Sequence, residues 1–359
     1  MVQIAYFIDY WNKVVALWLD KHVNAQSEVV YANRPLDAKK ECYYKDDHLT
    51  VNVETNQLPW FENKDTGKLL CPIHMPEPYW GNPDKCSIVI INYNPGGGLD
   101  MSPHTYKGKG APYPDNTMIE YVNRKSYSTL ALDFPLLKTK EELEKDERWW
   151  LRSYGGRKWW LQKKEWIEHL VDDWAKNGNK QSDEKESKLP IHTRRPFAIE
   201  LCGWHSQNWN DSTVSIINNV YRKEYMQKYF IHPLLHSIEK STTHLAVCIG
   251  KQFSQSLLAG NNDSCNINDI TQTINVNCND NTYQVVYDKK EKALKVIANN
   301  KTRHYRIYDI KHDNRSHIII NTWVQGSNHH PAKHFWPFEK SLINAIIQYQ
   351  LKNKPIKND

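Results

Sequence analysis

The chain has 359 residues and a net charge of +6, and its hydrophobic and charged fractions of 40% and 25% are ordinary for a globular protein. This length fits one large α/β domain with elaborations, or two domains, and the positive charge mildly favours a polyanionic partner. Seven cysteines without a Cys-x-x-Cys pair argue against a disulfide framework, a zinc ribbon or an iron–sulfur cluster. We therefore expect reduced thiols, a cytoplasmic location, and no metal or other cofactor.

The first 80 residues are predicted to form an N-terminal elaboration that packs on the rest of the protein. It begins with apolar residues at helical spacing from Ile4 to Leu19, which predict an amphipathic helix. Asp9 and Lys13 lie inside this segment, so it is not a membrane span. It also lacks the basic start and the small-residue cleavage site of a signal peptide. We therefore expect a docked helix and no membrane partner.

After about residue 80, short apolar runs alternate with helical patterns. Buried strands are predicted where β-branched runs are bounded by turn residues, at 87–93, 197–204, 243–250 and 317–323. Helices are predicted at 139–173 with an interruption at 154–157, at 211–240, after residue 250 and from Pro337 onward. This alternation predicts an α/β domain over residues 81–359, a three-layer α/β/α arrangement with a mostly parallel central sheet.

One segment of that domain has a different pattern. From about residue 264 to residue 312, alternating stretches such as "TYQVVYD" and "HYRIYDI" are separated by Asp, Asn and Lys turns. This pattern predicts an antiparallel β-meander inserted into the α/β domain.

Ligands of parallel sheets bind at the carboxyl ends of the strands, and polar motifs follow the first and the last predicted strand. Asn94-Pro95-Gly96 follows the first strand, without the spacing of a dinucleotide fingerprint or of a phosphate-binding P-loop. By itself it is either a structural turn or a place where a ligand approaches the backbone. His329-His330-Pro331 follows the last strand. Adjacent strand residues face opposite sides, so one functional histidine, His330, is a better interpretation than a metal pair, and surface histidines are the alternative.

Together, "NYNPGG" and "HHPAKHF" resemble the two signature motifs of the uracil-DNA glycosylase superfamily. Two further stretches agree with this resemblance: "HLAVCIGK" is similar to the penultimate strand of the family, and "GGRKWW" is similar to a stretch of its mismatch-type branch. The resemblance implies a parallel-sheet α/β/α fold for residues 81–359. It also implies hydrolysis of the N-glycosidic bond of a flipped, damaged or modified base in DNA, without a cofactor.

The resemblance assigns roles to individual residues. Asn94 would hold the attacking water, and His330 would donate a hydrogen bond to the departing base. Residues implied to bind the base are Tyr93, Pro95, Gly96, Gly97, Asn208 and, as stacking platforms, Trp159 or Trp160. Residues implied to contact the DNA are Lys107, Lys109, Arg157, Lys158 and Lys333, with His334 or Phe335 filling the position of the vacated base.

Other interpretations of the same sequence remain open. The tryptophan pair at residues 159 and 160 is also typical of a core or an interface. A protein of this fold without catalysis would bind nucleic acid or a nucleotide, with a strong dependence on salt. A third possibility is an enzyme that acts on another small molecule in the same pocket.

Overall fold

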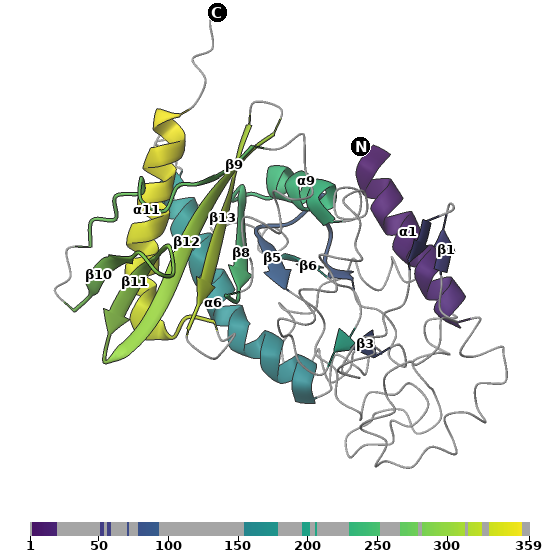
Figure 1. Cartoon of the computed structure of the whole chain (residues 1–359), viewed down its shortest axis with the longest axis horizontal. Coiled ribbons are helices and arrows are strands. Elements are labelled where there is room, and N and C mark those ends of the chain that lie inside the picture. Colours follow the sequence, from purple (N-terminus) through teal and green to yellow (C-terminus); the bar gives the residue numbers. More distant parts are fainter. Residues whose placement is uncertain are drawn as a thin grey trace, which may run out of the picture. The chain divides into compact units, whose positions relative to one another are not determined.

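The structure is a computed structural model of the 359-residue chain, shown in Figure 1. The residues that it describes are 2–19, 51–53, 56–58, 70–71, 78–92, 154–178, 196–201, 205–206, 230–251, 266–278, 282–312, 315–324 and 330–353.

The chain divides into two compact units, each built from several segments. Unit 1 contains Met1–Pro83, Asn92–Leu161 and Ala198–Leu234. Unit 2 contains Asp84–Ile91, Gln162–Phe197 and Leu235–Asp359. The expected N-terminal elaboration lies within unit 1, and the expected meander lies within unit 2.

The largest element of the described chain is a mixed sheet of nine strands. Its order is β10-β11-β12-β13-β8-β5-β6-β4, and β9 pairs with β12 beside this path. The bounds of these strands are β4 Tyr79–Trp80, β5 Val89–Asn92, β6 Phe197–Glu200, β8 Leu245–Ile249, β9 Asn266–Asp269, β10 Gln284–Asp288, β11 Ala293–Ala298, β12 Lys301–His312 and β13 Arg315–Trp323. The four predicted buried strands are therefore confirmed as β5, β6, β8 and β13.

The centre of the sheet is parallel. Strand β8 pairs in parallel with β13 and with β5. Between β5 and β6, the amide of Phe197 donates to Ile88 O and the amide of Leu201 donates to Asn92 O, so the two strands advance together in a parallel pattern. All described residues of β5, β6 and β8 are buried, as expected for strands covered on both faces.

The predicted antiparallel meander is confirmed, and it extends the same sheet. Strands β10, β11, β12 and β13 pair antiparallel in sequence order, with β12 aligned along the whole of β13. The expectation of a mostly parallel sheet therefore holds for the centre only, because the meander and the antiparallel β4–β6 pair make the sheet mixed.

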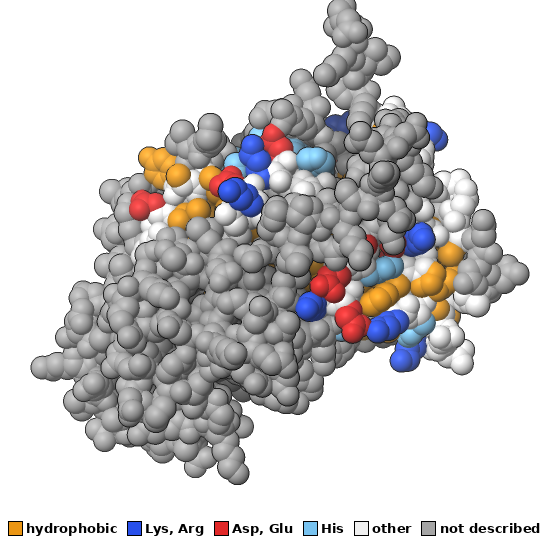
Figure 2. Space-filling view, turned by 180° about the vertical axis from the view of Figure 1, so that it is seen from behind, with side chains coloured by type: hydrophobic (Ala, Val, Ile, Leu, Met, Phe, Trp, Pro, Cys, Tyr) orange, Lys and Arg blue, Asp and Glu red, His pale blue; other side chains and the backbone are white. Residues whose placement is uncertain are grey.

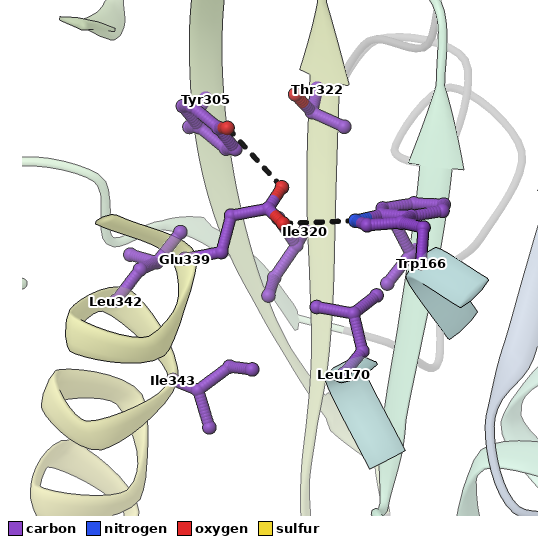
Figure 3. Close-up of a pocket in the computed structure, with 9 residues that line it drawn as sticks. Trp166, Leu170, Tyr305, Ile320, Thr322, Glu339, Leu342 and Ile343 are labelled. Atoms are coloured by element: carbon purple, nitrogen blue, oxygen red, sulfur yellow. Dashed lines mark hydrogen bonds between the residues drawn. The ribbon is translucent and has the colours of Figure 1, made fainter. Parts of the chain in front are cut away.

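Two long helices pack on one face of the unit 2 part of this sheet. Helix α6 spans Tyr154–Gly178 and helix α11 spans Trp336–Lys352 (Figure 1). Side chains of both helices line one cavity together with side chains of β8, β12 and β13 (Figure 3). The predicted interruption at residues 154–157 is wrong, because these residues form the first turn of α6. Pro337 opens α11 as predicted, where a missing amide hydrogen costs nothing.

A shorter helix precedes the penultimate parallel strand. Helix α9 covers His232–Lys240 and is connected to β8 by a turn in which His244 has a φ of 49°. Pro233 lies at its start, as predicted. The expected helical residues 211–229 and the helix expected after residue 251 fall outside the described residues, so the second helical layer of a three-layer domain stays a prediction.

In unit 1, helix α1 spans Val2–Leu19 and buries Ile4, Phe7, Tyr10 and Trp11, which confirms the predicted amphipathic helix. The ring centroid of Phe7 lies 5.0 Å from that of Tyr79 on β4. Two small antiparallel pairs complete the described part of this unit: β1 (Val51–Val53) with β2 (Asn56–Leu58), and β3 (Leu70–Cys71) with β7 (His205–Ser206). No described helix of the chain is both long and apolar enough to cross a membrane.

Candidate functional site

The parallel strands define where a ligand is most easily bound. Along the chain the parallel strands appear as β5, β6, β8 and β13, but their order in the sheet is β6-β5-β8-β13. The strand that follows β5 in this series, β6, lies on one side of the β5–β8 pair, and the strand that follows β8, β13, lies on the other side. The carboxyl ends of β5 and β8 are therefore a topological switch point, the usual location of a ligand crevice. The carboxyl end of β13 lies at the same edge, since β13 is parallel to β8.

The predicted motif after β5 falls outside the described residues. This holds for Asn94 and its neighbours Tyr93, Pro95, Gly96 and Gly97, and also for Lys107, Lys109 and Asn208. Residues Arg157, Lys158, Trp159 and Trp160 lie in the first two turns of α6, where the structure describes the backbone only. The roles of all these residues stay predictions.

The predicted motif before the last helix is described from His330 onward. His330 is half-buried, and its ring centroid lies 6.2 Å from that of Trp166 on α6, at an interplanar angle of 38°. The chain then forms a short 3-10 helix, η9 (Lys333–Phe335), which leads directly into α11. His330 is therefore held at the base of the last helix, against a buried tryptophan of α6.

Residues after His330 differ strongly in exposure. Lys333 is exposed, forms a 2.6 Å ion pair with Glu165 of α6 and places its ammonium 5.6 Å from the ring centre of Trp336. His334 is half-buried, and its backbone carbonyl accepts a hydrogen bond from the Tyr283 hydroxyl. Phe335 is buried, so a role in filling the position of a vacated base would require it to leave the core. His334 is already partly exposed, so its side chain would have to move less than that of Phe335 to fill the position of a vacated base.

A second histidine lies beside the same helix start. The His169 ring of α6 stacks on Trp336, with ring centroids 4.7 Å apart, and its Nε2 lies 3.2 Å from an oxygen of Asp173. Burial lowers the pKa of His169, and the carboxylate of Asp173 opposes this effect. His169 thus fixes the orientation of Trp336, and sequence reasoning did not single it out.

A small cavity lies between the two helices and the sheet (Figure 3), and Trp166, the ring neighbour of His330, is one of the residues that line it. It encloses a void of about 10 Å³, which is about the room that one water molecule needs. The side chains that line it are Trp166 and Leu170 of α6, Val247 of β8, Tyr305 of β12, Ile320 and Thr322 of β13, and Glu339, Leu342 and Ile343 of α11.

Glu339 is the acidic member of this cavity and is 3% exposed. Its two carboxyl oxygens accept hydrogen bonds from the Trp166 indole at 2.9 Å and from the Tyr305 hydroxyl at 3.2 Å, as Figure 3 shows. Burial raises the pKa of Glu339 to about 7, although the charge of Arg303 and the two hydrogen bonds act in the opposite direction. Arg303 is itself buried, and its Nε donates to the Thr322 hydroxyl at 2.7 Å.

Sequence reasoning missed Glu339, although a signal was present. Glu339 shares its helical phase with Leu342, Ile343 and Ile346, the buried stripe of α11. A glutamate in the apolar phase of a helix is unusual, because an ionisable side chain is rarely buried without partners. The position of Glu339 in this stripe therefore predicts a carboxyl group that is buried in the core.

A second buried polar pair lies at the carboxyl ends of β5 and β6, in unit 1. The Asn92 side-chain amide donates to a Glu200 carboxyl oxygen at 2.7 Å, and both residues are less than 10% exposed. The side chain of Asn92 therefore links the carboxyl ends of the two strands, two positions before Asn94 in the sequence.

The charges of the described surface do not form a separate basic patch in the view of Figure 2, where described Lys and Arg side chains lie beside acidic and histidine side chains. Two of the described surface lysines form ion pairs: Lys333 pairs with Glu165, and Lys251 pairs with Glu291. Within the described residues, no three His, Cys, Asp or Glu side chains are grouped so that they could hold a metal ion.

Comparisons with protein-family models, with curated proteins and with solved structures gave no match to this chain. The class of protein is therefore inferred from the residues and the geometry of the chain itself.

Proposed function

We propose that the protein is a uracil-DNA glycosylase-like hydrolase of the cytoplasm. It would remove a damaged or modified base from DNA by hydrolysing the N-glycosidic bond of the flipped nucleotide. In this proposal the domain is a three-layer α/β/α sandwich with the mixed sheet as its central layer.

One observation carries the proposal. The strands that precede the two motifs, β5 and β13, are both parallel to β8, so their carboxyl ends lie at one edge of the sheet. Asn94 follows Asn92, the last residue of β5, by two positions, and His330 follows Trp323, the last residue of β13, by seven. Loops at one edge of a parallel sheet are the usual source of residues for one site.

The residue types suit the chemistry. A glycosidic bond breaks when the base leaves as an anion and water attacks the sugar carbon. The Asn94 amide would orient that water, and the His330 imidazole would donate a hydrogen bond to the carbonyl oxygen of the departing base, where negative charge develops. His330 is half-buried, so it combines a protected environment with access to a ligand.

The exposed side chains after His330 fit a DNA contact. Lys333 is 73% exposed and can reach a phosphate, although its ion pair with Glu165 would have to open. Lys333 and half-buried His334 lie in η9, directly before the last helix, and positive side chains near the motif would hold the DNA backbone in register while the base is flipped.

The test is a base-release assay with purified protein and oligonucleotides that contain uracil, mismatches, and oxidised or deaminated bases, both single- and double-stranded. The wild-type protein should release at least one of these bases. Asn94→Ala and His330→Ala should each reduce the rate by about 10²–10³-fold, the usual effect of losing one group that stabilises the transition state.

The control is His244→Asn, a change of an exposed histidine in the turn before β8, which should leave the rate unchanged. Absence of base release over the whole panel would contradict the proposal. Salt-dependent binding of the oligonucleotides without release would instead favour a protein of this fold that binds nucleic acid without catalysis.

A further inference from the structure

The buried carboxyl group of Glu339 occupies a position that packing alone does not explain. A leucine would fill the same space without the cost of burying an ionisable group, which is several kcal/mol for an unpaired charge. Glu339 instead has a donor at each oxygen, the indole Nε1 of Trp166 at 2.9 Å and the hydroxyl of Tyr305 at 3.2 Å (Figure 3). These contacts connect α11 to α6 and to β12.

Trp166 links Glu339 to the candidate site. Its side chain is 1% exposed, its indole nitrogen points to Glu339, and its ring is tilted against the ring of His330 with centroids 6.2 Å apart. Aromatic rings at this separation interact favourably and restrict each other's orientation. The position of the Trp166 indole therefore restricts the orientations that the His330 ring can adopt.

We propose that Glu339 is a positioning residue: its carboxylate holds the Trp166 indole and thereby orients the His330 imidazole, so that a proton gained by Glu339 changes the orientation of His330. The catalytic importance of this arrangement depends on the proposed function, whereas the arrangement itself does not.

The chemistry of the two partners supports this link. An indole N–H can only donate, and an ionised carboxylate can only accept. When Glu339 gains a proton, one of its oxygens becomes a hydroxyl and the charge that strengthens both hydrogen bonds is lost. The indole of Trp166 is then held less firmly, and the ring of His330 follows it.

The titratable and hydrogen-bonding groups that face Glu339 come from two elements packed against its helix. Arg303 and Tyr305 belong to β12, and Asp173 and Trp166 belong to α6, while Glu339 itself lies in the first turn of α11. Arg303 favours the ionised carboxylate, and burial together with the charge of Asp173 favours the protonated form, which brings the pKa of Glu339 to about 7. The proton therefore exchanges within the pH range in which proteins usually work.

Nuclear magnetic resonance of the full chain tests the proposal without any DNA. Tryptophan and histidine are labelled with nitrogen-15, and the signals of Trp166 and His330 are identified by their loss in Trp166→Phe and His330→Gln. In the wild type we expect the indole signal of Trp166 to shift with a midpoint of about pH 7, and the ring signals of His330 to include the same step.

In Glu339→Gln the indole signal should lose this step, and the His330 titration curve should differ from that of the wild type. The matched control Glu168→Gln makes the same chemical change on α6 and should reproduce the wild-type curves. Identical His330 curves in the wild type and in Glu339→Gln would overturn the proposal, as would a wild-type Trp166 signal that does not change with pH. The second outcome needs no variant, so the test survives if Glu339→Gln does not fold.

These results are independent of the base-release assay. If the Trp166 and His330 signals behave as expected but no base is released, the positioning proposal stands and the proposed reaction fails. If bases are released but the signals do not respond, the reaction stands and the positioning proposal fails.

Discussion

Unit 2 has two buried regions of opposite character, the central strands β5 and β8 and the cluster around Glu339. Val89, Ile90 and Ile91 of β5 pair with residues of β8, which spans Leu245–Ile249. All of these residues are hydrophobic and at most 4% exposed. In the cluster, Glu339, Arg303 and Tyr305 are equally buried but polar. The strands gain stability from burial itself, whereas each polar group of the cluster contributes only while its partners are present.

The largest expected effect distinguishes the two regions. Glu339→Ala should reduce the free energy of unfolding by about 4 kcal/mol, since it leaves the buried Arg303 without its acidic neighbour and removes the acceptor of Trp166 and Tyr305. Urea unfolding measures this loss. The double variant Arg303→Met/Glu339→Leu should recover most of it, and a double variant as unstable as the single one would contradict this interpretation.

The pH dependence of stability is the second way to separate the regions. The pKa of Glu339 is raised to about 7 in the folded protein, above the value of an unfolded glutamate, so the folded state binds more protons between these two values. The stability that Glu339 contributes is therefore complete below the unfolded pKa of about 4.3 and is lost as the pH rises through about 7, a change of about 3 kcal/mol.

Urea unfolding at intervals from pH 4 to pH 8 measures this change. Glu339→Gln should remove the contribution and flatten the curve. An equally steep curve in Glu339→Gln would assign the pH dependence to other groups.

A change in the apolar strands should have a smaller effect without pH dependence. Ile90→Val removes one buried methylene group and should lower the free energy of unfolding by about 1 kcal/mol. The same loss is expected at pH 5 and at pH 8, because no titrating group is involved. A loss that differs between the two pH values would show that the strands and the polar cluster are coupled.

The smallest expected effect on stability is at Lys333. Its side chain is 73% exposed and its ion pair with Glu165 lies at the surface, so Lys333→Gln should leave the stability unchanged within error. If Lys333 contacts a phosphate as proposed, the same variant should weaken oligonucleotide binding for all sequences alike. It should also reduce the slope of log K against log salt by about 1. An unchanged salt slope would remove Lys333 from the DNA contact.

The comparison also shows what the sequence could predict. Strands such as Leu245–Ile249 are visible as apolar runs because burial on both faces requires every residue to be apolar. The meander and the helix after Pro337 are visible because their alternation and their apolar stripe repeat with the period of the backbone. These elements depend on local pattern, and the structure confirms them.

The parts that the sequence did not predict depend on contacts between distant residues. Nothing near Glu339 in the chain indicates that Trp166, 173 positions earlier, donates to its carboxylate. The joining of the meander to the central sheet depends on the pairing of β12 with β13, which turn chemistry alone does not specify. Within the candidate site, the contact of His330 with Trp166 also joins residues that are far apart in the chain, so local sequence patterns could not predict it.

The central claim is that Asn94 and His330 act together in one base-release reaction. The most direct measurement is a double-mutant cycle of single-turnover base release, with Asn94→Ala, His330→Ala and the double variant on the substrate that the wild type cleaves best. The account predicts that the double variant is scarcely slower than the slower single variant, because residues that act as a unit in one transition state have non-additive effects. Rates that fall by the product of the two single effects, or single variants as fast as the wild type, would contradict it.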